Sequence, residues 1–399
     1  MKTKVMVMSL MITLLLTGVC AANETEEEVL NKLFTYDEDN IGDLFSKSFL
    51  EKIPVPKVVE VVKGCKSPLG SLKKVKNEQK GYNLIFEKGN AQVYLSLNED
   101  KKINYLEFGD FNKNNDNLVD IKQDFKSLDG KVSVTILKNN NELVWGYNED
   151  DKMAVGSSFK LYVLKAVYDT INSSDKSWND VILLNVEDIS LPTGILQDWQ
   201  PGTPVTIKTL TNLMIQISDN TATDHLINYV GKNAIEKMAS EKNRPFLKTN
   251  ELFKLKYLAS SEIQTAYIEG AIEERQKILQ EIDDYDIGKI SVNSNPTRIN
   301  EIQWFFSTKE LCNIIYALKD AGEIQINPGF AKGKKWYLAG YKGGSEPGVL
   351  QYTHILQKDK DDNIYTVSVT INNPDKKVNK SKFNELTNRL ILLVKKGNI

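Results

Sequence analysis

Gly156-Ser-Ser-Phe-Lys-Leu-Tyr-Val-Leu-Lys-Ala-Val-Tyr168 combines a nucleophilic side chain, an amine and a long apolar run. The segment after Gly156 lacks Gly and Pro, which predicts a buried helix with Ser157 in its first turn. The Ser-x-x-Lys spacing puts Ser157 and Lys160 on one helix face. A serine hydroxyl needs a base to remove its proton, and lysine can be that base only where burial or nearby cations lower its pKa.

The Ser-x-x-Lys spacing is common, and the chain contains three copies of it, which begin at Ser71, Ser157 and Ser173. The first lies in a charged loop and the third in a polar turn. Only the copy at Ser157 leads into a long apolar helix, so we expect the nucleophile there.

Ser218-Asp219-Asn220 lies between two expected helices, residues 207–217 and 223–230. One interpretation is an N-cap for the second helix, which all three residue types favour. The functional interpretation makes Ser218 a proton shuttle between the lysine and a leaving nitrogen. Asn220 would then hydrogen-bond a substrate amide, and Asp219 would hold the loop in place.

Lys342-Gly343-Gly344 follows an apolar strand-like run, residues 336–341. It can be a plain turn at the end of the strand. Alternatively, the segment is part of a substrate-binding site, and its glycines let a substrate approach the backbone closely. Gly344 is then a substrate-binding residue. In that case Lys342 would attract an anionic group, and the N–H groups of Ser345 and Ser157 would form an oxyanion hole.

The chain is long enough for two domains with real cores. We expect a small α+β domain at residues 23–128 and a second α+β domain at residues 129–399, a mainly antiparallel sheet flanked by helices with a helical lobe. The expected strands of the first domain are 82–86, 91–97 and 103–108. Those of the second are 132–137, 143–147, 336–341, 349–356 and 364–371, followed by a closing helix at 381–395.

The three segments that begin at Ser157, Ser218 and Lys342, taken in this order, resemble motifs of the penicillin-recognising serine enzymes, class A β-lactamases in particular. The resemblance covers roughly residues 130–399 and implies a β-lactamase/transpeptidase-like fold. Asn243-Arg-Pro-Phe-Leu-Lys-Thr-Asn-Glu-Leu-Phe-Lys-Leu-Lys256 resembles a stretch of a two-domain subgroup. Membership of that subgroup implies a first domain with the cone-like fold of steroid isomerase and nuclear transport factor 2.

The resemblance implies a serine hydrolase that acts through an acyl-enzyme on β-lactams or related amides and esters, with a role in antibiotic resistance. Gly343 stands where the family has a hydroxyl residue, so a contact to a substrate carboxylate is lost or passes to Ser345. The family's Glu-x-x-Leu-Asn deacylation loop has no match after Ser157, and Glu251 is the nearest acidic candidate for the base. We therefore expect slow deacylation. The alternatives are a penicillin-binding sensor and a D,D-peptidase- or esterase-like protein.

Residues 1–22 are typical of a signal peptide, with Lys2 and Lys4 before an apolar run and small residues after it. This predicts export to the periplasm or medium, or anchoring to a membrane if Cys20 is lipidated. The net charge of −2 implies no strongly basic surface, so we expect no nucleic-acid partner. The expected partner is the small-molecule substrate. We expect no cofactor and no metal. Cys65 and Cys312 are expected as buried free thiols, although a disulfide is possible in an exported protein.

Overall fold

The computed structural model describes residues 25–79, 81–291 and 294–399, so the expected signal peptide and Cys20 lie outside the described residues. The chain divides into two compact units, Met1–Asp110 and Phe111–Ile399. Over the described ranges, none of the helices is both long and apolar enough to cross a membrane.

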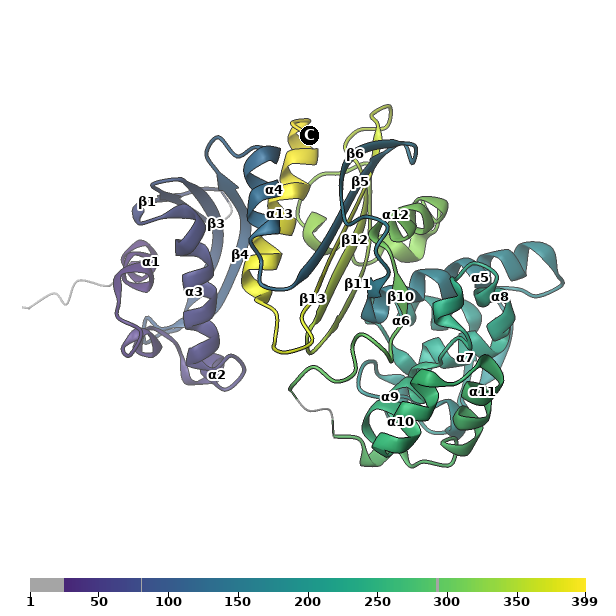
Figure 1. The fold of residues 1–399 in the computed structure, drawn as a ribbon. Coiled ribbons are helices and arrows are strands. Elements are labelled where there is room, and N and C mark those ends of the chain that lie inside the picture. Colours follow the sequence, from purple (N-terminus) through teal and green to yellow (C-terminus); the bar gives the residue numbers. More distant parts are fainter. Residues whose placement is uncertain (1–24, 80, 292–293) are drawn as a thin grey trace, which may run out of the picture. The chain divides into compact units, whose positions relative to one another are not determined.

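The first unit packs helices against a four-stranded sheet with the order β1-β2-β3-β4 (Figure 1). The first helix begins with a capping box formed by Thr25 and Glu28. Its buried face includes Phe34, whose ring meets that of Phe86 edge-on with 5.2 Å between the ring centroids. The elements are α1 (Glu26–Thr35), α2 (Lys47–Leu50), α3 (Val55–Leu69), β1 (Leu72–Asn77), β2 (Tyr82–Phe86), β3 (Gly89–Leu97) and β4 (Ile103–Lys113). The three expected strands correspond to β2, β3 and β4, whereas β1 was not anticipated.

Helix α4 (Leu118–Lys126) belongs to the second unit, although the sequence placed the domain boundary after residue 128. Its buried face, Ile121 and Phe125, packs in the same apolar cluster as Phe383 of α13 (Lys380–Lys396). This contact joins segments about 260 residues apart, so no local pattern could reveal it.

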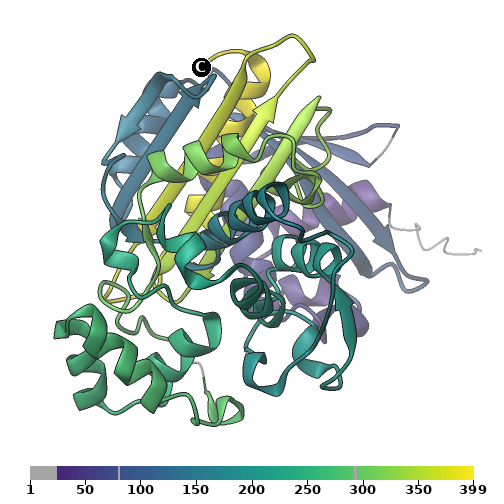
Figure 2. The same ribbon diagram turned by 90° about the vertical axis from the view of Figure 1, so that its right-hand side faces the viewer.

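The second unit is built on a five-stranded antiparallel sheet with the order β11-β12-β13-β5-β6 (Figure 2). Helices α13 and α4 cover one face of the sheet and α12 (Thr308–Ala317) covers the other (Figure 1). Burial from both sides explains why every residue of β12 is buried. The strands are β5 (Lys131–Lys138), β6 (Glu142–Tyr147), β11 (Leu338–Glu346), β12 (Val349–Gln357) and β13 (Ile364–Asn372). This arrangement confirms the expected antiparallel α+β architecture.

A helical lobe adjoins the sheet and has its own apolar core, which extends from Phe159 to Trp304 and Phe306. Two short strand pairs, β7 (Met153–Ala154) with β10 (Phe305–Phe306) and β8 (Val181–Leu183) with β9 (Pro204–Thr206), link its segments. Its helices are α5 (Lys160–Ser173), α6 (Ile207–Gln216), α7 (Asn220–Val230), α8 (Lys232–Glu236), α9 (Thr249–Tyr257), α10 (Ser261–Glu269) and α11 (Ile272–Glu281).

Two local details differ from the sequence expectations. Ser157 lies in a single 3-10 turn, Gly156–Phe159, that precedes α5 rather than in the first turn of the α-helix. Lys342, Gly343 and Gly344 lie inside β11, paired with β12, so they are not a turn at the end of a strand. Cys65 and Cys312 are buried free thiols, as expected.

A buried ion-pair network fastens α4 to α13 in the second unit. The Arg389 guanidinium pairs with Asp116 at 2.7 Å, Asp124 at 2.6 Å and Glu385 at 3.2 Å, and the Arg389 side chain is only 3% exposed. A guanidinium with several carboxylate partners is well suited to such a site because its N–H groups point in fixed directions.

We expect Arg389→Met to lower the free energy of unfolding by roughly 3 kcal/mol, because it leaves buried carboxylates without a cation. Urea unfolding measures the change. Lys376→Met is the matched control, since Lys376 pairs with Asp129 on the surface and its loss should cost less than about 1 kcal/mol. Equal effects of the two substitutions would contradict a structural role for the network.

Candidate active site

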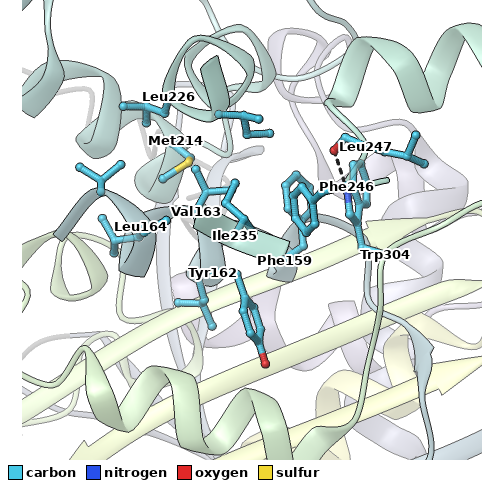
Figure 3. Close-up of a cluster of buried hydrophobic side chains, with 14 of the residues drawn as sticks. Phe159, Tyr162, Val163, Leu164, Met214, Leu226, Ile235, Phe246, Leu247 and Trp304 are labelled. Atoms are coloured by element: carbon cyan, nitrogen blue, oxygen red, sulfur yellow. Dashed lines mark hydrogen bonds between the residues drawn. The ribbon is translucent and has the colours of Figure 1, made fainter. Parts of the chain in front are cut away.

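The turn that carries Ser157 is fixed by aromatic packing beneath it. The Phe159 ring stacks on Trp304 with 3.8 Å between the ring centroids, and both side chains are buried (Figure 3). The Trp304 indole N–H donates to the Leu247 carbonyl at 3.0 Å, which orients the ring (Figure 3). The backbone of the turn is therefore held rigidly against the lobe.

Strand β11 approaches this turn so closely that there is no room for a side chain at Gly344 and little at Gly156. A Cβ on Gly344 would lie 2.0 Å from the Val155 carbonyl oxygen and 2.7 Å from the Ser157 nitrogen. On the other side, Gly156 has a φ of +49°, and a Cβ there would lie 3.1 Å from the Ser345 nitrogen. The two glycines thus bring the backbones of Ser157 and Ser345 together, where the sequence predicts an oxyanion hole.

Two lysines share the hydroxyl of Ser218. Lys160 Nζ lies 3.1 Å from Ser218 Oγ, and Lys342 Nζ lies 3.1 Å from the same oxygen. Lys160 also donates to the Ser218 carbonyl at 2.6 Å, and Lys342 to the Gly343 carbonyl at 2.8 Å. The three sequence segments therefore converge on one hydroxyl.

Burial removes both amines from water. Lys160 is 0% exposed and Lys342 is 3% exposed. Desolvation, together with the nearby charge of Lys342, holds the pKa of Lys160 well below its ordinary value of 10.5. Desolvation also lowers the pKa of Lys342 to about 7. Because the charged form is the one that burial disfavours, a neutral amine is accessible near neutral pH.

The backbone of Ser218 is itself constrained. Its φ is +61°, a left-handed conformation that costs a non-glycine residue about 1–3 kcal/mol. Asp219, which is fully buried, accepts three backbone N–H groups, from Ile195 at 2.7 Å, Leu196 at 3.0 Å and Ala222 at 2.8 Å. Asp219 therefore caps α7 and also holds the loop, so the two interpretations agree for this one residue.

The Asn220 side chain is used inside the protein. Its Oδ1 accepts from Lys160 Nζ at 2.7 Å, and its Nδ2 donates to the Leu191 carbonyl at 2.7 Å. Asn220 is 3% exposed. This geometry makes Asn220 a residue that positions Lys160, and its contact with a substrate amide stays a prediction.

An open cavity of about 460 Å³ lies beside these groups. Of the predicted site residues, Ser157, Ser218, Gly344 and Ser345 line it, whereas the buried Lys160, Asn220 and Lys342 lie behind this lining. Gly343, which the sequence analysis named beside Gly344, lines it too. The remaining lining residues were not anticipated as site residues: Thr193, Asn327, Gly329, Phe330, Tyr341, Tyr352 and Lys380. They come from distant loops and strands, so no local sequence pattern could identify most of them. The exception is Tyr341, which lies two residues before Gly343 and therefore on the same face of β11.

Ser157 and Lys160 are not joined directly. Within the described part of the chain, no hydrogen bond forms between Ser157 Oγ and Lys160 Nζ, and Lys160 bonds instead to Ser218 and Asn220. Catalytic hydrogen bonds are often completed only when substrate is present.

The two histidines have structural partners. His225 Nε2 accepts from the Asn185 backbone N–H at 2.9 Å, and the other ring nitrogen contacts the Thr221 carbonyl. His354 is fully buried, and desolvation lowers its pKa to about 3. Across residues 25–79, 81–291 and 294–399 no group of His, Cys, Asp or Glu side chains is placed to hold a metal ion.

Residues 116–277 match the model of the Beta-lactamase enzyme family. The matched range includes Ser157, Lys160 and Ser218 and ends before Lys342. A comparison with curated proteins found no match.

Among solved structures, the chain is similar to a β-lactamase from Sphaerobacter thermophilus DSM 20745 (18% identity, 70% of this chain and 97% of that chain covered, TM-score 0.48). A class A β-lactamase from Mycobacterium abscessus gives 14% identity, 70% and 98% coverage and a TM-score of 0.48. A β-lactamase from Francisella tularensis gives 19% identity, 70% and 97% coverage and a TM-score of 0.46. Identities this low leave the activity to be inferred from the site residues.

Glu251, the candidate for the deacylation base of a β-lactamase, has other partners. Both of its carboxylate oxygens accept from Lys232 Nζ, at 2.6 and 2.7 Å, and one accepts from the Lys248 backbone N–H that begins α9. It is not among the described residues that line the cavity. The geometry thus gives Glu251 a helix-capping role and lends no support to a role as base.

The buried Lys342 makes stability depend on pH. Its pKa is about 7 in the folded chain and near its ordinary 10.5 when unfolded, so between these values the unfolded chain binds more protons. The free energy of unfolding therefore rises with pH over this window. We expect Lys342→Met to reduce the rise between pH 7 and pH 10, measured by urea unfolding at both values.

Lys332→Met provides the control for this measurement, because Lys332 is exposed. It should leave the rise as in the unsubstituted protein. An equal rise in the Lys342→Met protein would show that this amine is not desolvated.

Proposed function

We propose that this protein is a serine hydrolase that forms an acyl-enzyme with β-lactams or related amides and esters. One observation carries the proposal: two buried lysines meet at Ser218 Oγ, directly behind a cavity that Ser157 lines. Buried amines beside a half-buried alcohol that lines a cavity are the elements that acyl transfer needs when no histidine is available. The match of residues 116–277 to the Beta-lactamase enzyme family supports the same chemistry.

In the proposed reaction, Ser157 Oγ attacks the substrate carbonyl carbon and its proton passes to neutral Lys160. The backbone N–H groups of Ser157 and Ser345 stabilise the negative charge that develops on the carbonyl oxygen. The bond from the carbonyl carbon to the leaving nitrogen or oxygen then breaks. The leaving atom receives the proton through Ser218 Oγ, and water later hydrolyses the ester to restore Ser157.

The contacts of Lys160 support the shuttle role of Ser218. A neutral amine has two hydrogens and one lone pair, and two of its three contacts are to oxygens that can only accept, the Ser218 carbonyl and Asn220 Oδ1. The remaining contact is the Ser218 hydroxyl, which can give a proton to the lone pair. Lys342, bonded to the same hydroxyl, stabilises negative charge on it during transfer.

The partners of Glu251 support slow deacylation as part of the proposal, because its carboxylate is neutralised by Lys232 away from the cavity. A long-lived acyl-enzyme is what a penicillin sensor requires, which keeps the sensor as the second candidate. Export, periplasmic location and a steroid-isomerase-like first unit belong to the same proposal and rest on the sequence.

We expect Ser157→Ala to abolish covalent labelling by benzylpenicillin, detected by intact-protein mass spectrometry, and to lower any turnover by on the order of 10⁶. Ser173→Ala is the matched control, because Ser173 begins another Ser-x-x-Lys copy but is exposed and bonded to the Asp169 carbonyl. It should label as the unsubstituted protein does. Labelling that survives Ser157→Ala but not Ser218→Ala would identify Ser218 as the nucleophile instead.

We expect Glu251→Gln to change the rate at which the acyl adduct disappears by less than about threefold, whereas loss of a general base typically costs 10²- to 10⁴-fold. The glutamine can still accept from the Lys248 N–H, so the helix cap is retained. The measurement is the decay of the mass shift after excess penicillin is removed. A hundredfold slower decay would identify Glu251 as the base after all.

A further inference from the structure

The side chain of Tyr341 occupies a slot that two glycines make for it. A Cβ on Gly343 would lie 2.0 Å from the Tyr341 hydroxyl oxygen and 2.8 Å from Cζ. A Cβ on Gly329 would lie 2.6 Å from Cγ and 2.7 Å from Cδ2 of the same ring. No real Cβ approaches other atoms so closely, so the tyrosine accounts for glycine at position 343. It also excludes a side chain at position 329, where the φ of +57° by itself favours glycine.

The Tyr341 hydroxyl therefore lies where a side chain of residue 343 would begin. Residues 341, 343 and 345 are two apart on β11, so their side-chain positions share one face of the strand. All three line the cavity beside Ser157. The ring extends along this face and places its oxygen over Gly343.

The Tyr341 hydroxyl has no hydrogen-bond partner among the described residues of the protein. No group in the described part of the chain hydrogen-bonds to the Tyr341 oxygen, whereas the neighbouring Tyr352 hydroxyl donates to Asn384 Oδ1 at 2.8 Å. Burial raises the pKa of Tyr341, which keeps the hydroxyl protonated and able to donate. A protonated phenol that faces a cavity is available to a ligand.

The charges around the cavity favour an anionic ligand. Among the described residues that line it, Lys380 is the only charged one, and no aspartate or glutamate is present. Lys380 is exposed, whereas Lys342 is 3% exposed and lies behind the cavity lining. The accessible positive charge is thus supplied by Lys380.

We propose that the Tyr341 hydroxyl is the group that hydrogen-bonds a carboxylate of the substrate, in the space that a side chain at residue 343 would otherwise fill, with Lys380 supplying the attracting charge. This rests on the proposed acyl transfer at Ser157. It assigns substrate preference to a residue outside the three sequence segments that carry the chemistry.

The test compares benzylpenicillin with its methyl ester, which differ in the carboxylate alone. We expect Tyr341→Phe to slow acylation by benzylpenicillin about 10- to 100-fold, the usual effect of losing a hydrogen bond to a charged group, and to change acylation by the methyl ester less than twofold. Tyr337→Phe, at an exposed tyrosine outside the cavity lining, should leave both rates unchanged. An unaltered ratio of the two rates in Tyr341→Phe would overturn the proposal.

A second pair of variants tests the shared space. Gly343→Ser alone should lose stability and the preference for the carboxylate, because the new side chain meets the Tyr341 ring. In Tyr341→Ala/Gly343→Ser the ring is gone, so the serine hydroxyl should restore most of the preference. A Gly343→Ser protein with unchanged stability and preference would show that the tyrosine does not fill this space.

Failure of the proposed function is distinguishable from failure of this inference. If neither compound acylates the unsubstituted protein, the proposed function fails for β-lactams. The inference is then decided by the binding of phenylacetate and phenylacetamide, measured by ligand-observed NMR. Tighter binding of phenylacetate that Tyr341→Phe abolishes would support the role of Tyr341. Equal binding of the two compounds would overturn it.

Discussion

Two buried lysine amines share the hydroxyl of Ser218, which lines the cavity. Each Nζ lies 3.1 Å from Ser218 Oγ, and the two side chains come from α5 and from β11. Two ammonium ions this close and this buried would repel strongly, so the arrangement is stable only if at least one amine is neutral. The burial and closeness of the two amines thus favour a neutral lysine, and a neutral lysine can act as a base.

The surrounding fold serves to keep this contact. The Phe159–Trp304 stack fixes the turn before α5, Asp219 fixes the loop before α7, and the pairing of β11 with β12 fixes Lys342. Phe159, Trp304 and Asp219 are not among the described residues that line the cavity, whereas β11 and β12 contribute residues to its lining. A reactive group held by packing and capping elsewhere loses little entropy when substrate binds.

Glycine has two different purposes along β11. At Gly344 it allows the strand to touch the backbone of the Ser157 turn, and at Gly343 it makes room for the side chain of a residue two positions earlier. Tyr341 therefore presents its hydroxyl oxygen at the point where a side chain of residue 343 would begin. Packing against Tyr341 thus explains why position 343 is glycine.

The sequence alone determined the five strands of the sheet in the second unit, the helices that correspond to α5, α6, α7 and α13, and the three segments of the site, because these depend on periodicity and residue chemistry within short windows. Only the tertiary structure decided which atoms meet. It placed α4 with α13, turned the Asn220 amide toward Lys160 and Leu191, paired Glu251 with Lys232, and put the Tyr341 hydroxyl over Gly343. These outcomes depend on contacts between distant segments and on side-chain direction, and neither is encoded in local sequence pattern.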